Sequence, residues 1–369
     1  MIIVYVITFI IYLLLSYLFV DSNLIYLKAL FTNIAFQNRT FVSAIFLIVV
    51  SSQFLIYIYL LLRKLTFTQL KKPLLIIILV LLLSYSAILS YDIFNYILTA
   101  KVTYFYHENP YIVMPIEFAN EPYLAFTRAA NKLALYGPVW IVLSGVPFIL
   151  GANNFIMIMF LFKIFVTSFF IGTIYLIWKM TKSKYSVVLF ILNPLVLIET
   201  VGSGHNDIVM MFFALLSFFL FSKKRIALSI IALILSIFIK YATVFLMPVF
   251  IYLLYKHYKK ETINWQKIYL YSFILMLCVF LLSFLREEIY PWYALWFFVF
   301  IPLIKYNSAV FYLTTAMLYG LMLRYLPFMY TGSYFGLTPI LKMILWITPV
   351  ALTSVYLSLK HKLWSRIRF

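Results

Sequence analysis

The chain has very little cysteine and very little negative charge. Its 369 residues include a single cysteine, Cys278, which excludes an intramolecular disulfide and a cysteine-rich metal site. Asp and Glu together number 10, and all charged residues make up only 11% of the chain. A soluble domain of this length carries about 25% charged residues. The composition therefore excludes an ordinary soluble domain, and the sequence has no internal repeat.

Apolar sequence takes the place of charge. Hydrophobic residues make up 66% of the chain, and its mean hydropathy is +1.06. Apolar runs of about 15 to 25 residues follow one another, as in proteins whose helices cross a bilayer repeatedly. We predict an all-α polytopic membrane protein with about 12 transmembrane helices. The expected helices are 1–20, 41–62, 73–90, 154–178, 185–200, 207–221, 226–239, 241–255, 268–285, 292–304, 308–323 and 336–359.

Lys and Arg cluster in the connections between the apolar runs, and this distribution predicts the topology. Cytoplasmic loops favour these residues, so we attribute the net charge of +19 to loops beside anionic lipid and expect no nucleic-acid partner. The run 2–20 lacks a basic start and an A-x-A-like cleavage site, so we expect a retained span with a cytoplasmic N-terminus. Of the acids, only Glu261 falls in a cytoplasmic loop. An active site facing the exterior of the cell membrane explains this skew.

One long external loop, 91–153, follows from this topology. The run Pro138–Gly151 has about 14 residues, fewer than the roughly 20 needed to span, so we expect a helix at the outer interface. The loop then has room for two or three juxtamembrane helices. We expect one integral membrane domain, 1–369, in which residues 1–72 add two N-terminal spans. The core is then 73–304, and residues 305–369 hold C-terminal spans and a basic cytoplasmic tail.

The external loop begins with SYDIFNYILTAKV, which places one of the few acids, Asp92, directly after an apolar run. Ionisable groups near a bilayer are costly and are functional candidates by default. The alternative role for Asp92 is a helix N-cap. Aromatic and amide groups accompany it, among them Tyr91, Asn95 and Tyr136, and these suit contact with a sugar or an acceptor. Anchoring in an interfacial aromatic belt is the alternative role of the tyrosines.

A second polar stretch, NPLVLIETVGSGHND, falls on the same side of the membrane as Asp92. The Asn-Pro pair predicts a break or kink in a helix. Four polar residues follow and are candidates for sugar or acceptor contact: Glu199, His205, Asn206 and Asp207. Asn206 or Asp207 could alternatively be only the N-cap of the next helix. His205 alone does not indicate a metal site.

Basic residues on the outer side are candidates for binding a phosphate. Lys240, between two short apolar runs, would find a natural partner in a phosphate oxygen, although a snorkelling lysine is the alternative. Arg286 is a similar candidate, flanked by Glu287 and Glu288, which could simply neutralise it. Lys163 lies deep in an apolar run and must face protein or a wet cavity, with a partner that the sequence does not identify.

Five stretches in this order resemble those of a known family. They are SYDIFNYILTAKVTYFYHENPY, YGPVW, NPLVLIETVGSGHND, IKYATVFLMP and YPWYALW, within about 84–304. The sequence resembles the bacterial polyprenol-phosphate-mannose-dependent mannosyltransferases of the GT-C superfamily. The resemblance implies a GT-C fold with a long first external loop, a sugar donor on a polyprenyl phosphate, and Asp92 as the catalytic base. GT-C enzymes often pair two acids closely, whereas Asp92 stands alone, which leaves metal dependence open.

We therefore expect a membrane glycosyltransferase that moves a sugar, by default mannose, from a polyprenyl-phosphate donor to a hydroxyl of an envelope glycan or glycolipid. Asp92 would act as general base in an inverting transfer. Lys240 and Arg286 would stabilise the leaving phosphate. No cofactor is assigned, and the sequence does not support a divalent metal. The alternatives are a lipid-linked glycan flippase or other transporter, and a glycan polymerase or ligase that uses an undecaprenyl diphosphate substrate.

Overall fold

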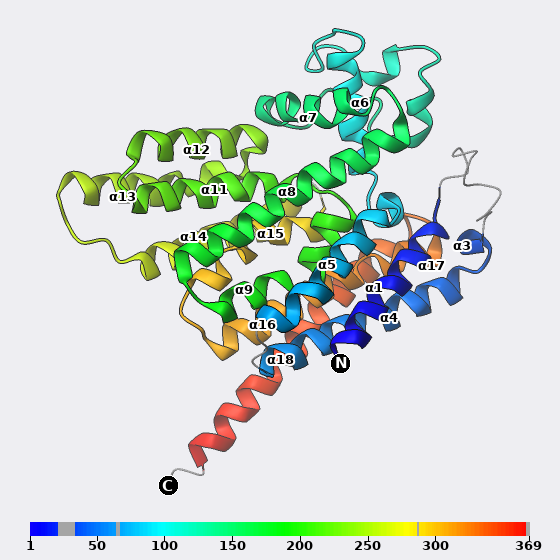
Figure 1. The fold of residues 1–369 in the computed structure, drawn as a ribbon. Coiled ribbons are helices and arrows are strands. Elements are labelled where there is room, and N and C mark those ends of the chain that lie inside the picture. Colours follow the sequence, from blue (N-terminus) through cyan, green and yellow to red (C-terminus); the bar gives the residue numbers. More distant parts are fainter. Residues whose placement is uncertain (21–33, 64–66, 286–287, 367–369) are drawn as a thin grey trace.

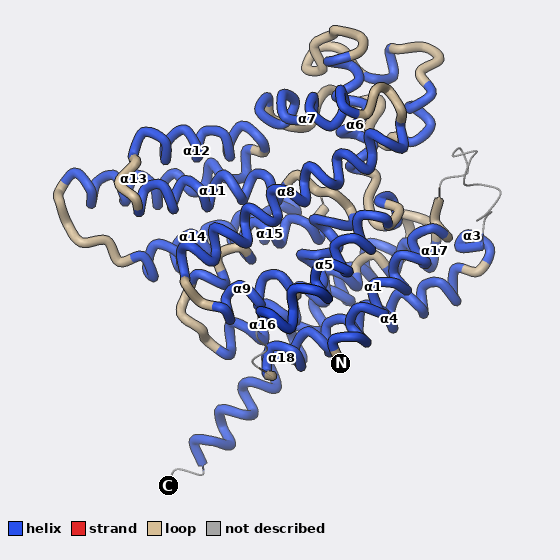
Figure 2. The backbone as a smooth tube through the Cα atoms, viewed as in Figure 1, coloured by secondary structure: helices blue, strands red, loops and turns tan. Residues whose placement is uncertain are grey.

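The computed structural model describes residues 1–20, 34–63, 67–285 and 288–366, and over these ranges the protein is all-helical with no strand. Figure 2 shows helices that are joined by short loops over most of the bundle. The predicted fold class, a helical membrane protein, agrees with this architecture. Side chains are described over the same ranges, except at residues 67–68 and 361–366.

Five helical segments are long and apolar enough to cross a membrane, and a bent pair could form a sixth span. They support the membrane prediction, whereas the predicted number of about 12 spans is not confirmed. The five segments are α4 (Arg39–Leu62), α8 (Phe155–Thr181), α14 (Trp265–Leu282) with η6 (Ser283–Leu285), α16 (Ser308–Leu323) with α17 (Leu326–Thr331), and the part of α18 (Thr338–Arg366) that ends at Lys360.

The remaining helices are shorter than a bilayer is thick. Several predicted ranges still match them closely, and 226–239 coincides with α12. Six of these shorter helices are α1 (Ile2–Tyr17), α3 (Ile34–Gln37), α5 (Phe67–Leu83), α11 (Asp207–Ser222), α12 (Ile226–Ile239) and α13 (Met247–Tyr258).

Three predicted spans are not continuous helices. The range 185–200 is broken into α9 (Lys184–Ile191) and a second segment that is bent by 62° relative to α9. This second segment consists of α10 (Pro194–Leu197) and the π-helix η4 (Ile198–Gly202). The break falls at Asn193-Pro194, because Pro194 cannot continue α9 and the Asn193 side chain caps α10 by accepting from the Val196 N–H.

The other two corrections concern 292–304 and 241–255. The first consists of short turns, η7 (Pro291–Ala294), α15 (Leu295–Phe298) and η8 (Ile301–Leu303), two of which begin with a proline in their first turn. The second begins as the 3₁₀ helix η5 (Tyr241–Leu246) before α13. Tight, irregular turns therefore occupy the segments that carry Lys240 and the YPWYALW aromatics.

The predicted external loop forms a compact layer at one end of the bundle, above α8 (Figure 1). Its elements are α6 (Asp92–Tyr104), η2 (Pro115–Glu117), η3 (Pro122–Phe126) and α7 (Pro138–Leu150). A buried ion pair between Lys101 Nζ and Glu121 Oε1, 2.9 Å apart, ties α6 to η3. Tyr106 donates a hydrogen bond to the second oxygen of the same carboxylate. Both charges of this buried pair are therefore matched within the loop.

The long helices define two ends of the molecule. We name the end at α6 the α6 end, where Phe155 at the start of α8 packs on Phe94 and Phe126. The other end, which we name the basic end, holds the end of α8, the end of α11 and the beginnings of α9, α14 and α16. Helix α18 projects beyond the bundle at its C-terminal part (Figure 1).

Candidate active site

Asp92 is the first residue of α6, and its side chain is 25% exposed. The N-cap of α6 is Tyr91, and no side-chain cap is present. The capping role considered for Asp92 is therefore wrong, and the carboxylate is free for other contacts. Its position in the first turn still favours a negative charge there, because the helix dipole is positive at this end.

His205 lies between two carboxylates. Its Nδ1 atom is 3.6 Å from Asp92 Oδ2, and its Nε2 atom is 3.2 Å from Glu199 Oε2. The His205 side chain is fully buried, and its ring stacks on the Trp292 ring with centroids 4.0 Å apart. Burial lowers the pKa of His205, but contacts with Asp92 and Glu199 outweigh it and raise this pKa to about 9. The imidazole is therefore protonated at neutral pH.

Glu199 comes from the π-helix η4 and is fully buried. Its second oxygen, Oε1, accepts a hydrogen bond of 2.8 Å from the Tyr325 hydroxyl. A buried carboxylate needs such partners, because burial without them is costly. Glu199 is thus held from two sides, by Tyr325 and by the His205 ring. It supports His205 in the position facing Asp92.

The turn that carries His205 requires a glycine. Gly204 has φ +76, a conformation that side chains rarely adopt, and a Cβ there would lie 3.3 Å from Ile93 Cδ1. The turn is thereby pressed against the start of α6. The short distance between His205 and Asp92 follows from this close approach.

Lys163, for which the sequence identified no partner, is fully buried on α8 beside the Gly204 turn. Its Nζ atom donates to the carbonyl oxygens of Leu81 (2.7 Å) and Ser84 (2.5 Å). These carbonyls belong to the end of α5, so the lysine occupies acceptors that a longer helix would need. Helix α5 ends at Leu83 rather than at the predicted residue 90, and Lys163, Ser84 and Ser16 together satisfy the backbone groups at this end. The chain is then free to turn before Asp92.

A second polar cluster surrounds Asp207, the first residue of α11. Its carboxylate oxygens lie 3.0 and 3.1 Å from Lys240 Nζ, and Oδ1 also accepts a 2.5 Å hydrogen bond from the Trp296 indole. The Lys240 ammonium lies 4.4 Å from the centroid of the Tyr293 ring. Lys240 therefore points inward, and its side chain is 17% exposed, so it is not a snorkelling lysine.

Tyr96 and Tyr136 lie between the Asp92 and Asp207 clusters. Their rings pack edge to face with centroids 4.8 Å apart, and Tyr96 donates a 3.3 Å hydrogen bond to Asn206 Oδ1. Asn206 is the N-cap residue of α11, as the alternative had it, but its side chain forms no capping hydrogen bond. The adjacent Gly137 allows α7 to touch α12, since a Cβ there would lie 2.1 Å from the Phe238 carbonyl oxygen.

Two further predicted residues flank this region. Asn95 Oδ1 accepts a hydrogen bond from the Thr127 hydroxyl of the loop. The Arg128 guanidinium lies over the Tyr91 ring, 4.5 Å from its centroid. Arg128 itself is exposed, so it places a positive charge beside the residue that precedes Asp92.

The structure brings most of the predicted site residues to the α6 end. Asp92 and Glu199 each contact His205, Asp207 pairs with Lys240, and Arg286 lies outside the described residues. The prediction missed several residues that complete these contacts. They are Trp292, Tyr293, Trp296, Tyr325, Thr127 and Arg128. The clustered aromatics of YPWYALW were a usable signal, whereas Tyr325 is one of 31 tyrosines and gave none.

No set of three or more His, Cys, Asp or Glu side chains within the described ranges converges in a way that could hold a metal ion. Around Asp92 the reason is visible in the contacts. The His205 ring lies between the two carboxylates, so Asp92 and Glu199 meet its nitrogens from different sides.

A family model described as alpha-(1->6)-mannopyranosyltransferase, N-terminal domain, matches residues 6–256. The chain belongs to this family. The resemblance to a bacterial mannosyltransferase family is thereby confirmed, and the family supports a glycosyltransferase with mannose. The match contains Asp92, Glu199, His205, Asp207 and Lys240 but ends before the aromatic residues of 290–296. No curated protein and no solved structure matches the chain.

Proposed function

We propose that the protein is a membrane mannosyltransferase that uses a polyprenyl-phosphate donor and transfers its sugar to a hydroxyl of an envelope glycan or glycolipid. The observation that carries the proposal is the partly exposed Asp92 carboxylate beside His205, which is buried and lies between Asp92 and Glu199. A general base needs an accessible oxygen and a fixed direction, and this pair supplies both. The family match supports the sugar-transfer chemistry.

The proposed step is an inverting displacement at the anomeric carbon. The acceptor hydroxyl gives its proton to Asp92, and its oxygen forms a bond to the anomeric carbon. The bond between that carbon and the phosphate oxygen breaks, and its electron pair leaves with the polyprenyl phosphate. The phosphate needs no proton. Attack from the face opposite the phosphate inverts the configuration.

His205 acts on Asp92 rather than on the substrate in this proposal. Its buried ring has no exposed surface, so the substrate cannot reach it directly. The imidazole fixes the direction of the Asp92 carboxylate, and Glu199 on the other side of the ring balances the positive charge of the imidazole. His205 and Glu199 are therefore positioning residues, and Asp92 is the residue that touches the reacting hydroxyl.

The leaving phosphate requires positive charge near the site. Lys240 directs two of its three N–H donors at the Asp207 carboxylate, so one donor remains for a phosphate oxygen. Arg128 adds a second cation on the Tyr91 side. Arg286 remains a proposed contact. The stacked rings of Tyr293 and Trp296, 4.2 Å apart, form a surface on which a sugar ring could lie.

The external orientation and the entry of the donor from the bilayer belong to the same proposal. The distribution of Lys and Arg supports the orientation, since these residues cluster in the connections predicted to be cytoplasmic, while the acids other than Glu261 fall on or near the outer side of the predicted topology. About 12 crossings would require some helices shorter than 20 residues to cross a locally thinned membrane.

The test uses the purified full chain in detergent, without a membrane or a membrane potential. A short-chain polyprenyl phosphate carrying radiolabelled mannose serves as donor and octyl mannoside as acceptor. We expect a labelled disaccharide glycoside and the free polyprenyl monophosphate. A transporter would leave the donor intact, and an enzyme active only on polyprenyl diphosphates would contradict the proposed donor. Mass spectrometry of envelope glycans from cells with and without the gene then identifies the natural acceptor.

A further inference from the structure

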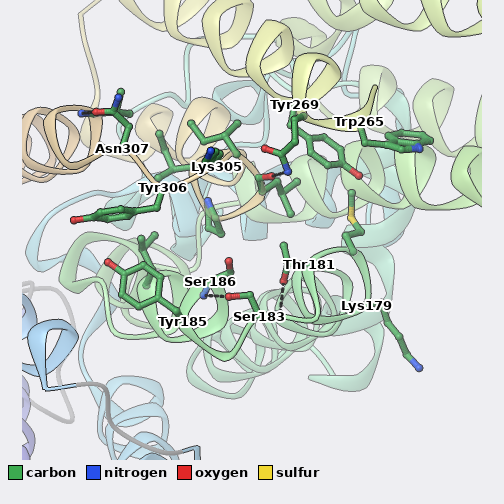
Figure 3. A pocket seen from close by; sticks show the side chains of 18 of the residues that line it. Lys179, Thr181, Ser183, Tyr185, Ser186, Trp265, Tyr269, Lys305, Tyr306 and Asn307 are labelled. Carbon is green, nitrogen blue, oxygen red and sulfur yellow. Dashed lines mark hydrogen bonds between the residues drawn. The ribbon is translucent and has the colours of Figure 1, made fainter. Parts of the chain in front are cut away.

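A cavity of about 530 Å³ opens at the basic end, between the end of α8 and the beginnings of α9, α14 and α16 (Figure 3). It lies at the far end of α8 and α11 from Asp92 and has no part in the proposed sugar transfer. We propose that this cavity binds the phosphate group of an anionic lipid.

The charge of the cavity is the first argument. Three of its lining residues are lysines, Lys179, Lys223 and Lys305, and none is an acid. In Figure 3 the Lys179 side chain points away from the cavity, which leaves Lys223 and Lys305 as its cations. Neither of these two forms an ion pair with a described carboxylate. Glu261, the acid that falls at this end, forms an ion pair with Lys256 instead. A phosphate would supply the missing negative charge.

Three of the other polar side chains of the cavity already donate hydrogen bonds within the protein. The Thr181 hydroxyl donates to the Ile177 carbonyl oxygen (2.8 Å) and the Ser222 hydroxyl donates to the Phe219 carbonyl oxygen (2.6 Å). The Gln266 amide donates to Leu303 O at 3.2 Å. Lys223 and Lys305 are the groups that bring positive charge into the cavity, so an anion there would be held chiefly by these two lysines.

The apolar part of the cavity favours a lipid over a free phosphate. Buried Leu189, Leu303 and Phe311 line it together with the cations. Tyr185 and Tyr306 pack edge to face with centroids 5.6 Å apart and form one wall. The cavity also lies where three candidate membrane-spanning segments begin or end. A phosphate group attached to an apolar chain matches both parts of this lining, whereas inorganic phosphate matches only the lysines.

The experiment compares two double variants of the full chain in a neutral detergent. Lys223→Gln/Lys305→Gln removes the two cavity cations. Lys72→Gln/Lys259→Gln removes two exposed lysines that do not line the cavity and serves as the matched control. The probes are dioctanoyl phosphatidic acid, dioctanoyl phosphatidylcholine and inorganic phosphate, and the dissociation constant of each is measured by thermophoresis.

We expect saturable binding of phosphatidic acid by the unchanged protein and at least about tenfold weaker binding by Lys223→Gln/Lys305→Gln, because each lysine provides a charge-assisted hydrogen bond. The control should stay within about twofold on the same scale. Ser186→Phe, which adds bulk to the cavity without changing charge, should also weaken binding.

Three outcomes would overturn the inference. Equal losses in the two double variants would show attraction by surface charge alone. Absence of saturable phosphatidic acid binding would remove the site altogether. Inorganic phosphate that binds as tightly as phosphatidic acid, and displaces it, would show a site for free phosphate rather than for a lipid. None of these results bears on sugar transfer at Asp92, so the two proposals fail separately.

Discussion

Replacing His205 by glutamine should change how the stability of the protein depends on pH. In the folded protein the imidazole lies between Asp92 and Glu199, and its pKa is raised from 6.5 to about 9. A group whose pKa is higher in the folded state adds stability that is fully present below its unfolded pKa. The added stability is therefore complete below pH 6.5 and is lost as the pH rises through about 9.

The size of this effect follows from the same rise in the pKa of His205. Each pKa unit corresponds to about 1.4 kcal/mol, so the contribution to the free energy of unfolding is about 3 kcal/mol. His205 is completely buried, so solvent does not screen its contacts as it would at the surface. An effect of this size is a large fraction of the net stability of a folded domain, about 5–15 kcal/mol.

The assay is thermal unfolding of the detergent-purified protein, followed between pH 6 and pH 10. The transition temperature of the unchanged protein should fall between pH 6.5 and about pH 9. His205→Gln should be less stable at pH 6.5 and should lack this fall, because no titrating group then separates the carboxylates. His257→Gln, at an exposed histidine of α13, is the control and should retain the fall. A flat profile for the unchanged protein, or the same fall in His205→Gln, would refute the reasoning.

Three further predictions concern the residues that support the site. Glu199→Gln removes one of the two carboxylates beside His205, so the alkaline loss of stability should move to lower pH, and an unmoved midpoint in the same titration would contradict this. Lys163→Met removes two buried hydrogen bonds and leaves the Ser84 carbonyl without its lysine partner, whereas the Leu81 carbonyl still accepts from Ser84. It should lower the free energy of unfolding by about 2 kcal/mol, measured by chemical denaturation, and equal or greater stability would argue against the role of Lys163. Gly137→Ala should cost about 1–3 kcal/mol, because its Cβ overlaps the Phe238 carbonyl oxygen. Gly202→Ala, whose Cβ meets nothing closer than 3.5 Å, is its control and should be tolerated in the same denaturation measurement.

Much of the fold could be predicted because apolar runs and their polar boundaries mark helices directly. The ranges expected for α12 and α16 coincide with the helices that form. Asn193-Pro194 indicated a break, yet the expected span 185–200 ran through it, since length and hydropathy cannot show how far a chain bends. The end of α5 was missed because a lysine from α8, distant in sequence, binds its last carbonyls.

The candidate site could be predicted only in part. Scarcity of acids directed attention to Asp92, Glu199 and Asp207, because each ionisable group near a bilayer needs a reason. His205 contacts two of these acids because the Gly204 turn packs against α6. The spacing of apolar residues along the sequence does not reveal this packing. Tyr325 reaches Glu199 from the end of α16, a contact between segments far apart in the chain.

The turnover number of Asp92→Asn, relative to the unchanged protein, tests the central claim most directly. The variant keeps the shape of the side chain, so its unfolding temperature at pH 7 should remain close to that of the unchanged protein, while transfer of labelled mannose should fall by about 10²–10⁴-fold or more. Glu108→Gln, at an exposed acid of the same loop, should leave transfer unchanged. An Asp92→Asn protein that is folded and still transfers mannose at the original rate would contradict the role of Asp92 as the base.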